Sequence, residues 1–557
     1  MLLGTIRLKS IESILVVPAI SREELLIGHS RAAGPNGLSP PFSGFLRVEA
    51  LLGVQYTSLV RIPLYEKRLH AAIAVAALTI FAVVLCAANR GDRWRQYVAN
   101  LAAEGGGQQS GPTAQRRTAD YIAAQLQAAG VLPAAANGYM QPVKLRTRRI
   151  IEQYSRLDLA RDGAIRPIVL GQDAIVGMDV DPAPWASAPL VFIGYGLTVP
   201  ELGYDDLAGL DLHGKIAVIL SGGPPNIPVD LRAHYQSPQK RDEFLRRKAG
   251  VFGIVTIPNP KDTGISWQRT ASSRLRSSMS LADPAFDQDD ELELSIVFNP
   301  ERANLLFEHS GHTLDEILAK AAAGRPIPHF PLPASLLAKI AVERGEIESQ
   351  NVIGVLPGSD PVLKAESVAL TARLDDSGTE TGSAAAASLL DTAEGLHESM
   401  IKLRRSLLFV FFTSEDASLL GSRFFTRYPS TAVGSIVADL NLSTFHPLFS
   451  PATVAISGSS DSDLGAAVLP VAARNGVRVS NTTGPRRIPL TEGSHYTFIR
   501  HGIPSIGLAL GLADGNQPLD KMTAFRIDGM LLQFAATIAN RTARPRWSAT
   551  SPFKRFQ

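Results

Sequence analysis

Cysteine is almost absent from this sequence: Cys86 is the only one among 557 residues, and there are 11 histidines. A single cysteine excludes an internal disulfide bond and a structural zinc site built on several thiolates. The formal net charge is +3 with no large basic block, which argues against nucleic acid as the main partner. No Gly-x-Ser-x-Gly motif occurs, and Gly105-Gly-Gly107 has no Lys-Ser/Thr after it. Neither a serine nucleophile nor a phosphate loop is therefore expected.

The composition is that of a globular protein, with 45% hydrophobic and 19% charged residues. A chain of this length exceeds what one hydrophobic core supports, so we expect two folded domains with additional segments. The sequence pattern divides the chain into six segments. A leader of unknown role at 1–66, predicted to be disordered, precedes an apolar segment at 67–90, and a basic tail at 542–557 is predicted to fray. Between them lie an N-terminal part of the main domain at 91–160, an inserted domain at 164–335 and the main domain at 345–541.

One segment is a candidate for membrane insertion. The run 71–88 contains no charged residue and follows Lys67 and Arg68, which is typical of a signal peptide or a transmembrane anchor. Arg90 and two further arginines follow the run and argue against an anchor; a buried helix is the alternative. The run predicts an exported protein that is membrane-anchored, periplasmic or extracellular. Residues 1–66 are then either a cytoplasmic leader or an upstream start that is not used.

Apolar runs predict most of the regular structure. Runs such as Leu407–Phe412 are apolar throughout, which is typical of strands buried on both faces of a parallel sheet between helices. In the inserted region short runs predict strands at Leu190–Gly194, Lys215–Leu220 and Gly253–Ile257. We therefore expect an α/β fold, with further strands at Val352–Leu356, Val368–Leu374, Ser406–Phe412, Ile436–Leu442, Thr453–Ile456 and Ser505–Leu510, and helices at Ala114–Ala129, Ala384–Leu396, Ser462–Asn475 and Ile527–Asn540.

Polar residues collect where these predicted strands end. In an open α/β sheet, ligands bind beyond the carboxyl ends of the strands. Those ends read Arg373-Leu-Asp375-Asp376, Ser414-Glu415-Asp416, Asn441-Leu-Ser443 and Gly511-Leu-Ala-Asp514. This rim is the candidate functional site. The alternative is that Ser414 and Glu415 only cap the helix that follows them.

The C-terminal half contains recognisable segments: Asn351-Val-Ile-Gly-Val-Leu-Pro-Gly-Ser-Asp360, Phe412-Thr-Ser-Glu-Asp416, Leu419-Leu-Gly-Ser-Arg423, Ile436-Val-Ala-Asp-Leu-Asn-Leu442, His495-Tyr-Thr-Phe and His501-Gly-Ile-Pro504. Together they resemble peptidase family M28, the zinc aminopeptidases. Val191-Phe-Ile-Gly-Tyr-Gly196 and the stretch through Gly214-Lys-Ile resemble the protease-associated (PA) domain inserted in many members. The resemblance covers roughly 92–540. It implies an M28-type mixed, mostly parallel sheet sandwiched by helices, with an inserted β-rich PA-like domain.

The resemblance also implies a site with two zinc ions, held by a His, a bridging Asp, a Glu, a second Asp and a final His. Carried over residue by residue, the first His falls on Arg373, which stays protonated and cannot bind a metal. The second Asp falls on Ser443, a poor ligand. The bridging Asp would lie near Glu380 or Thr381, and the final His around Asp514-Gly-Asn516, where the sequence has no His. Most of the family's metal ligands are therefore missing.

Three matching positions keep an acid. Asp416 takes the place of the metal-binding Glu, and Glu415 that of the general base that deprotonates a zinc-bound water. Asp375 corresponds to the acid that orients the first His. A single weak metal site from Asp416 with Asp376 and Glu380 stays an alternative.

The crowding of acids predicts a role for the arginine at this rim. Glu415, Asp416 and Asp375 would repel one another without metal ions. Arg373 supplies a permanent cation, so we predict that it forms an ion pair with one of them and stands in for the metal charge.

Three functions remain open. The first is a non-catalytic M28-like protein without a cofactor that binds a peptide or protein outside the cytoplasmic membrane. The second is an active zinc aminopeptidase with an atypical or single-metal site. The third is a membrane-tethered scaffold in which the PA-like domain makes the contacts. The expected partners are a peptide or protein ligand and a membrane, through 71–88, and not nucleic acid.

Overall fold

The computed structural model describes residues 90–105, 112–237, 240–241, 243–263, 266–286, 292–374, 380–416, 418–446, 453–480, 490–491, 493–511 and 521–556. The chain divides into two compact units, Met1–Ala74 and Val75–Gln557, and the fold described here belongs to the second. The predicted leader and the apolar run 71–88 lie outside the described residues. Among the residues that are described, no helix combines the length and the apolar character needed to cross a bilayer.

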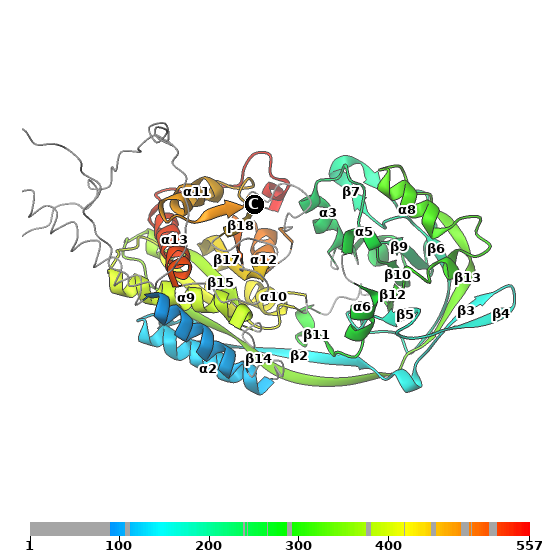
Figure 1. Cartoon of the computed structure of the whole chain (residues 1–557), viewed down its shortest axis with the longest axis horizontal. Helices are drawn as coiled ribbons and strands as arrows, with labels where there is room; N and C mark the ends of the chain where they lie inside the picture. Colours follow the sequence, from blue (N-terminus) through cyan, green and yellow to red (C-terminus); the bar gives the residue numbers. More distant parts are fainter. Residues whose placement is uncertain are drawn as a thin grey trace, which may run out of the picture. The chain divides into compact units, whose positions relative to one another are not determined.

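A ten-stranded sheet forms the larger domain (Figure 1). Its centre is parallel, because β16, β15, β17 and β20 run in one direction. Antiparallel pairings flank this centre, β14 with β16 on one side and β18 with β20 on the other. The strands lie in the order β11 (Ser278–Leu281), β2 (Met140–Ile150), β14 (Val342–Leu356), β16 (Ser406–Phe412), β15 (Ser367–Arg373), β17 (Ile436–His446), β20 (Ser505–Gly511), β18 (Thr453–Ser457) and β19 (Arg478–Ser480), and β1 (Leu132–Pro133) pairs with β14.

Strand β16 shows why its sequence is apolar throughout. Leu407, Phe409 and Phe411 point into a core that they share with helices on one face of the sheet. Leu408 and Phe412 point into a second core on the other face. A strand with helices on both faces has no solvent-facing side, so alternation of polar and apolar residues disappears. The predicted fold class, an α/β protein with a mixed sheet between helices, is confirmed.

The four helices predicted for this domain are present, and the helices at Leu420–Arg427 and His495–Arg500 were not among them (Figure 1). Gly130, which follows the predicted helix Ala114–Ala129, adopts a left-handed backbone (φ +69°) that favours glycine. Residues 90–104 are also helical. The remaining helices are α2 (Pro112–Ala128), α9 (Glu380–Ser399), α10 (Leu420–Arg427), α11 (Leu464–Arg474), α12 (His495–Arg500) and α13 (Lys521–Asn540).

An eight-stranded sheet forms the second domain, with parallel pairing among β6, β9, β10 and β12. It begins at Arg156 rather than near 164, because β3 and β4 form an antiparallel hairpin in this sheet. Its strands are β4 (Ala164–Ile168), β3 (Arg156–Arg161), β13 (Phe330–Lys339), β6 (Trp185–Phe192), β9 (Ile216–Leu220), β10 (Gly253–Ile257), β12 (Leu294–Phe298) and β5 (Ala174–Val176).

Short elements complete the second domain. Its helices are α3 (Val229–Gln236), a π-helix at Glu243–Lys248, α5 (Pro260–Thr263), α6 (Trp267–Ser273), α7 (Asn304–Phe307) and α8 (Leu314–Ala322). Strands β7 (Thr198–Val199) and β8 (Tyr204–Asp205) form a separate ribbon. The likeness of this domain to a PA domain stays a prediction.

The C-terminal segment corrects one expectation. The stretch 542–557 was expected to fray, but it packs against the protein through a buried Trp547 and a fully buried Phe553. The Trp547 indole donates a hydrogen bond to the carbonyl oxygen of Gly502 (2.8 Å). A hydrophobic cluster with Leu490 and Tyr496 covers the two rings. The expectation rested on the basic and proline residues of the segment and overlooked these two aromatic side chains, which anchor it.

Candidate functional site

The parallel strands bring the predicted site residues to one edge of the large sheet. Because β15, β16 and β17 are parallel, their carboxyl ends lie at the same edge. Arg373 is the last residue of β15, and Glu415 and Asp416 follow β16. Ser443 lies near the end of β17. The structure therefore brings these four residues to the same edge of the sheet.

The pairing predicted for Arg373 is present. Its guanidinium forms an ion pair with the Asp416 carboxylate, across the ends of β15 and β16. The Arg373 side chain is mostly buried (19% exposed), whereas Asp416 is 78% exposed. The pair thus places a fixed cation inside the rim and its counter-charge at the surface. Asp375, the third acid of the prediction, lies outside the described residues.

Glu415 is buried and held by hydrogen bonds. The backbone N–H of Ser422 donates to Glu415 Oε1 (2.8 Å), and the Ser422 hydroxyl donates to Oε2 (2.9 Å). The hydroxyl of Ser494, which precedes α12, also donates to Oε2 (2.5 Å). Ser422 lies in the first turn of α10, so the carboxylate satisfies an N–H that has no partner within the helix. Glu415 thus caps the helix that follows it, which was the alternative considered from the sequence. Ser422 and Ser494 were not predicted from the sequence as its partners.

The loop around Glu415 has an unusual backbone. Ser414 (φ +55°), Ser418 (φ +72°) and Leu419 (φ +59°) all adopt left-handed conformations. Such conformations are uncommon for residues with a side chain and persist only where surrounding contacts enforce them. The hydrogen bonds to Glu415 are contacts of this kind, because they tie the loop to both α10 and α12.

A chain of buried polar groups lies beneath the rim, and it was not anticipated. The Thr371 hydroxyl donates to Asp439 Oδ1 (2.8 Å), and the Asn441 amide donates to the Thr371 hydroxyl (2.8 Å). His495 Nδ1 lies 3.3 Å from Asn441 Oδ1. Burial raises the pKa of Asp439 to about 8 and lowers the pKa of His495 to about 4, so both groups are neutral near pH 7. The sequence did contain a signal for this buried chain, because Asp439 and Asn441 lie two residues apart in an otherwise apolar strand and so point to the same face.

Two cationic pockets open beside the Glu415 loop, between α10 and α12. They measure about 140 and 220 Å³ and share Arg423, Thr497 and Arg500. Arg427 lines the larger one and Leu419 the smaller one. No Asp or Glu is among the lining residues of either pocket. The arrangement favours an anionic group next to the rim.

The comparison with known proteins agrees with this architecture. The sequence matches Peptidase family M28 over residues 351–547. Those residues are therefore similar to this peptidase family. No curated protein matches the sequence.

Solved structures with a similar fold include three peptidases. An aminopeptidase from Aneurinibacillus sp. strain AM-1 is 16% identical with a TM-score of 0.49, and the match covers 82% of this chain and 95% of that chain. A zinc aminopeptidase from Bacillus subtilis is 15% identical with a TM-score of 0.42, covering 80% and 94%. A peptidase M28 precursor from Shewanella amazonensis SB2B is 16% identical with a TM-score of 0.43, covering 84% and 98%. Likenesses this distant assign no activity to the present chain.

The described residues at the predicted ligand positions do not together form a donor set for two zinc ions. Arg373, which the resemblance predicted at the position of the first histidine, engages Asp416, which it predicted at a metal-ligand position. Ser443 offers a hydroxyl whose proton is directed at Leu508 O (3.5 Å). Over the described ranges, no three His, Cys, Asp or Glu side chains are grouped so that they could hold a metal ion. Asp376, Asp514 and the side chain of Glu380 lie outside the described part, and so does Asp375, the predicted orienting acid.

Proposed function

We propose that this protein is a non-catalytic M28 homologue that binds a peptide or protein ligand at the rim of its M28 domain, outside the cytoplasmic membrane. The ion pair between Arg373 and Asp416 carries the proposal. A permanent guanidinium charge at the position of a zinc-binding imidazole repels a divalent cation and competes with it for Asp416. Glu415 supports the same conclusion, because three hydrogen bonds already engage its carboxylate.

The cationic pockets beside the rim support an acidic ligand. Arg423 and Arg500 line both pockets, and Arg427 adds a third guanidinium to the larger one. Guanidinium groups bind carboxylates through paired, charge-assisted hydrogen bonds. Thr497, which lines both pockets, supplies a hydroxyl nearby. A peptide with aspartate or glutamate side chains matches this surface.

Zinc content and peptide-bond hydrolysis test the first part of the proposal, that the protein is not a catalyst. We expect the full chain, dialysed against zinc and then against buffer, to retain no stoichiometric zinc by elemental mass spectrometry. We also expect hydrolysis of leucine p-nitroanilide at the rate of the buffer blank, because no metal-bound water is formed. The control is Glu415→Gln, which should leave both measurements unchanged.

Other outcomes have clear meanings. Two zinc ions per chain, with hydrolysis that Glu415→Gln abolishes, would show a working dizinc aminopeptidase and refute the proposal. One zinc per chain with the same Glu415-dependent hydrolysis would establish the single-metal alternative.

A substitution of Arg500, one of the two arginines that line both pockets, tests the second part of the proposal, that the ligand is acidic. Arg500→Ala is expected to weaken binding of the blocked peptide Ala-Glu-Asp-Glu-Ala about tenfold, measured by isothermal titration calorimetry, because a charge-assisted hydrogen bond is lost. Arg474→Ala is the matched control, since this arginine ends α11 and lines neither pocket. Equal binding of the peptide with glutamine and asparagine in place of its acids would contradict an acidic ligand.

A further inference from the structure

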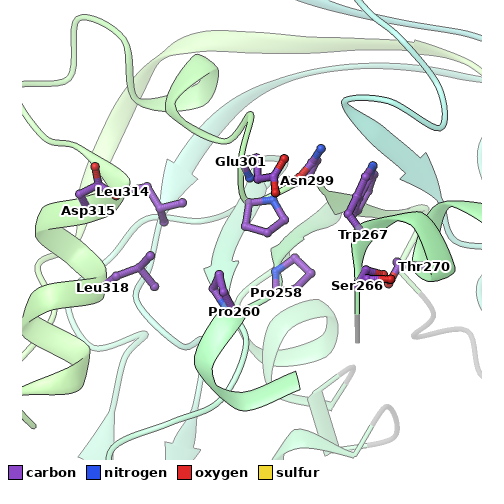
Figure 2. A pocket seen from close by; sticks show the side chains of 11 residues that line it. Pro258, Pro260, Ser266, Trp267, Thr270, Asn299, Glu301, Leu314, Asp315 and Leu318 are labelled. Carbon is purple, nitrogen blue, oxygen red and sulfur yellow. Dashed lines mark hydrogen bonds between the residues drawn. The ribbon is translucent and has the colours of Figure 1, made fainter. Parts of the chain in front are cut away.

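The second domain has a pocket of its own, of about 400 Å³ (Figure 2). It opens where two neighbouring parallel strands end, because Pro258 follows β10 and Asn299 and Pro300 follow β12. In sheets of this kind, ligands bind beyond the carboxyl ends of the strands. Helices α6 and α8 supply the remaining walls through Trp267 and Leu314.

Prolines, leucines and a tryptophan make much of the pocket wall apolar. Figure 2 shows Pro258 and Pro260 between Trp267 on one side and Leu314 and Leu318 on the other. The Trp267 indole donates a hydrogen bond to the carbonyl oxygen of Gly171 (3.1 Å), which holds the ring in place. Prolines and a tethered indole lose little conformational freedom when a ligand binds, so the pocket is prepared for an apolar group.

Two carboxylates line the same pocket, Glu301 after β12 and Asp315 in the first turn of α8. Both are exposed, and neither has an ion pair among the described residues. Other acids of the same domain are paired with cations of the chain: Asp173 with Arg302, Glu293 with Arg246, Glu308 with Arg161, and Glu316 with Lys320. Glu301 and Asp315 therefore place two negative charges without a described counter-ion at the pocket.

We propose that this pocket binds a peptide through one arginine or lysine side chain. The apolar stem of the side chain packs on the prolines and the Trp267 ring, whose face also attracts a cation. Its charged end pairs with Glu301, and Asp315 attracts it from the far wall. This site is separate from the M28 rim and does not depend on the function proposed there.

The test uses the full chain and a blocked peptide, Ala-Leu-Arg-Leu-Ala, which carries one charge. We expect calorimetry to detect its binding, and the same peptide with citrulline in place of arginine to bind at least about tenfold more weakly, because citrulline keeps the shape without the charge. The double variant Glu301→Gln/Asp315→Asn should weaken binding of the arginine peptide by a similar factor and leave the citrulline peptide unchanged. Glu343→Gln is the control, since Glu343 is an exposed acid on β14, outside the pocket.

Three results would overturn this inference. Equal affinity for the arginine and citrulline peptides would remove the role of the charge. Unchanged binding in the double variant would place the peptide elsewhere. Binding of ethylguanidine as tight as that of the peptide would show a site for small cations, because the apolar contacts would then contribute nothing. None of these results bears on the zinc content or hydrolysis of the M28 domain.

Discussion

Replacing Arg405 with alanine is expected to lower the free energy of unfolding by about 3–5 kcal/mol. Its side chain is 1% exposed, and its Nε donates to Glu366 Oε2 (2.6 Å). Its two terminal nitrogens donate to the carbonyl oxygens of Arg541 and Thr542. The substitution removes a buried ion pair and leaves two carbonyl groups without this donor, at the point where α13 leads into the C-terminal segment.

The neighbouring arginine provides the control for this prediction. Arg404 is 39% exposed and pairs with Asp360 (2.8 Å) near the surface. Solvent screens such a pair, so Arg404→Ala should cost less than about 1 kcal/mol. Urea denaturation followed by circular dichroism measures both variants against the parent chain. Equal losses for the two variants would show that burial of Arg405 is unimportant.

Replacing Asp439 with asparagine is expected to change how stability depends on pH. Burial raises the pKa of Asp439 to about 8, well above its ordinary value. Between roughly pH 4 and pH 8 the folded protein therefore keeps a proton that the unfolded chain has lost. The free energy of unfolding then falls as the pH rises through this window, by at most about 1.4 kcal/mol for each pH unit from this group. Asparagine has no such titration and keeps the acceptor for the Thr371 hydroxyl.

The expected result is a smaller loss of stability between pH 5 and pH 8. We expect Asp439→Asn to reduce that loss by about 2–4 kcal/mol, with the variant more stable than the parent at pH 8. Asp360→Asn is the control, because hydrogen bonds from the backbone of Leu363 and from Arg404 lower the pKa of Asp360 to about 2, outside the window. Urea denaturation at pH 5, 6, 7 and 8 gives the slopes. Parallel slopes for the Asp439 variant and the parent would refute the raised pKa.

The sequence predicted the buried strands well, since their burial dictates their composition. The apolar runs at Gly253–Ile257 and Ser406–Phe412 have the bounds that β10 and β16 adopt. The long pair β2 and β14 was largely missed. Much of β14 is polar and exposed, and its first part is held by hydrogen bonds to β2 rather than by an apolar face. Hydrophobic periodicity carries no signal for such a ribbon.

The site was predicted in part for a similar reason. The strand ends were visible in the sequence, and the fixed charge of Arg373 among acids required a partner. Which acid it would pair with was open, because that choice depends on the register of β15 against β16. The buried C-terminal segment was hidden because Phe553 gains its neighbours, such as Trp547 and Tyr496, only in the folded chain.

The sequence by itself determined the α/β class, the strands of the parallel centre and the rim at their carboxyl ends. The tertiary structure decided that Arg373 pairs with Asp416 and that Ser422 and Ser494 engage Glu415. It also placed the second domain's pocket between two strand ends and two helices. Strands follow from local patterns of burial, whereas ion pairs and pockets arise where segments distant in the chain converge, and no local pattern records that convergence.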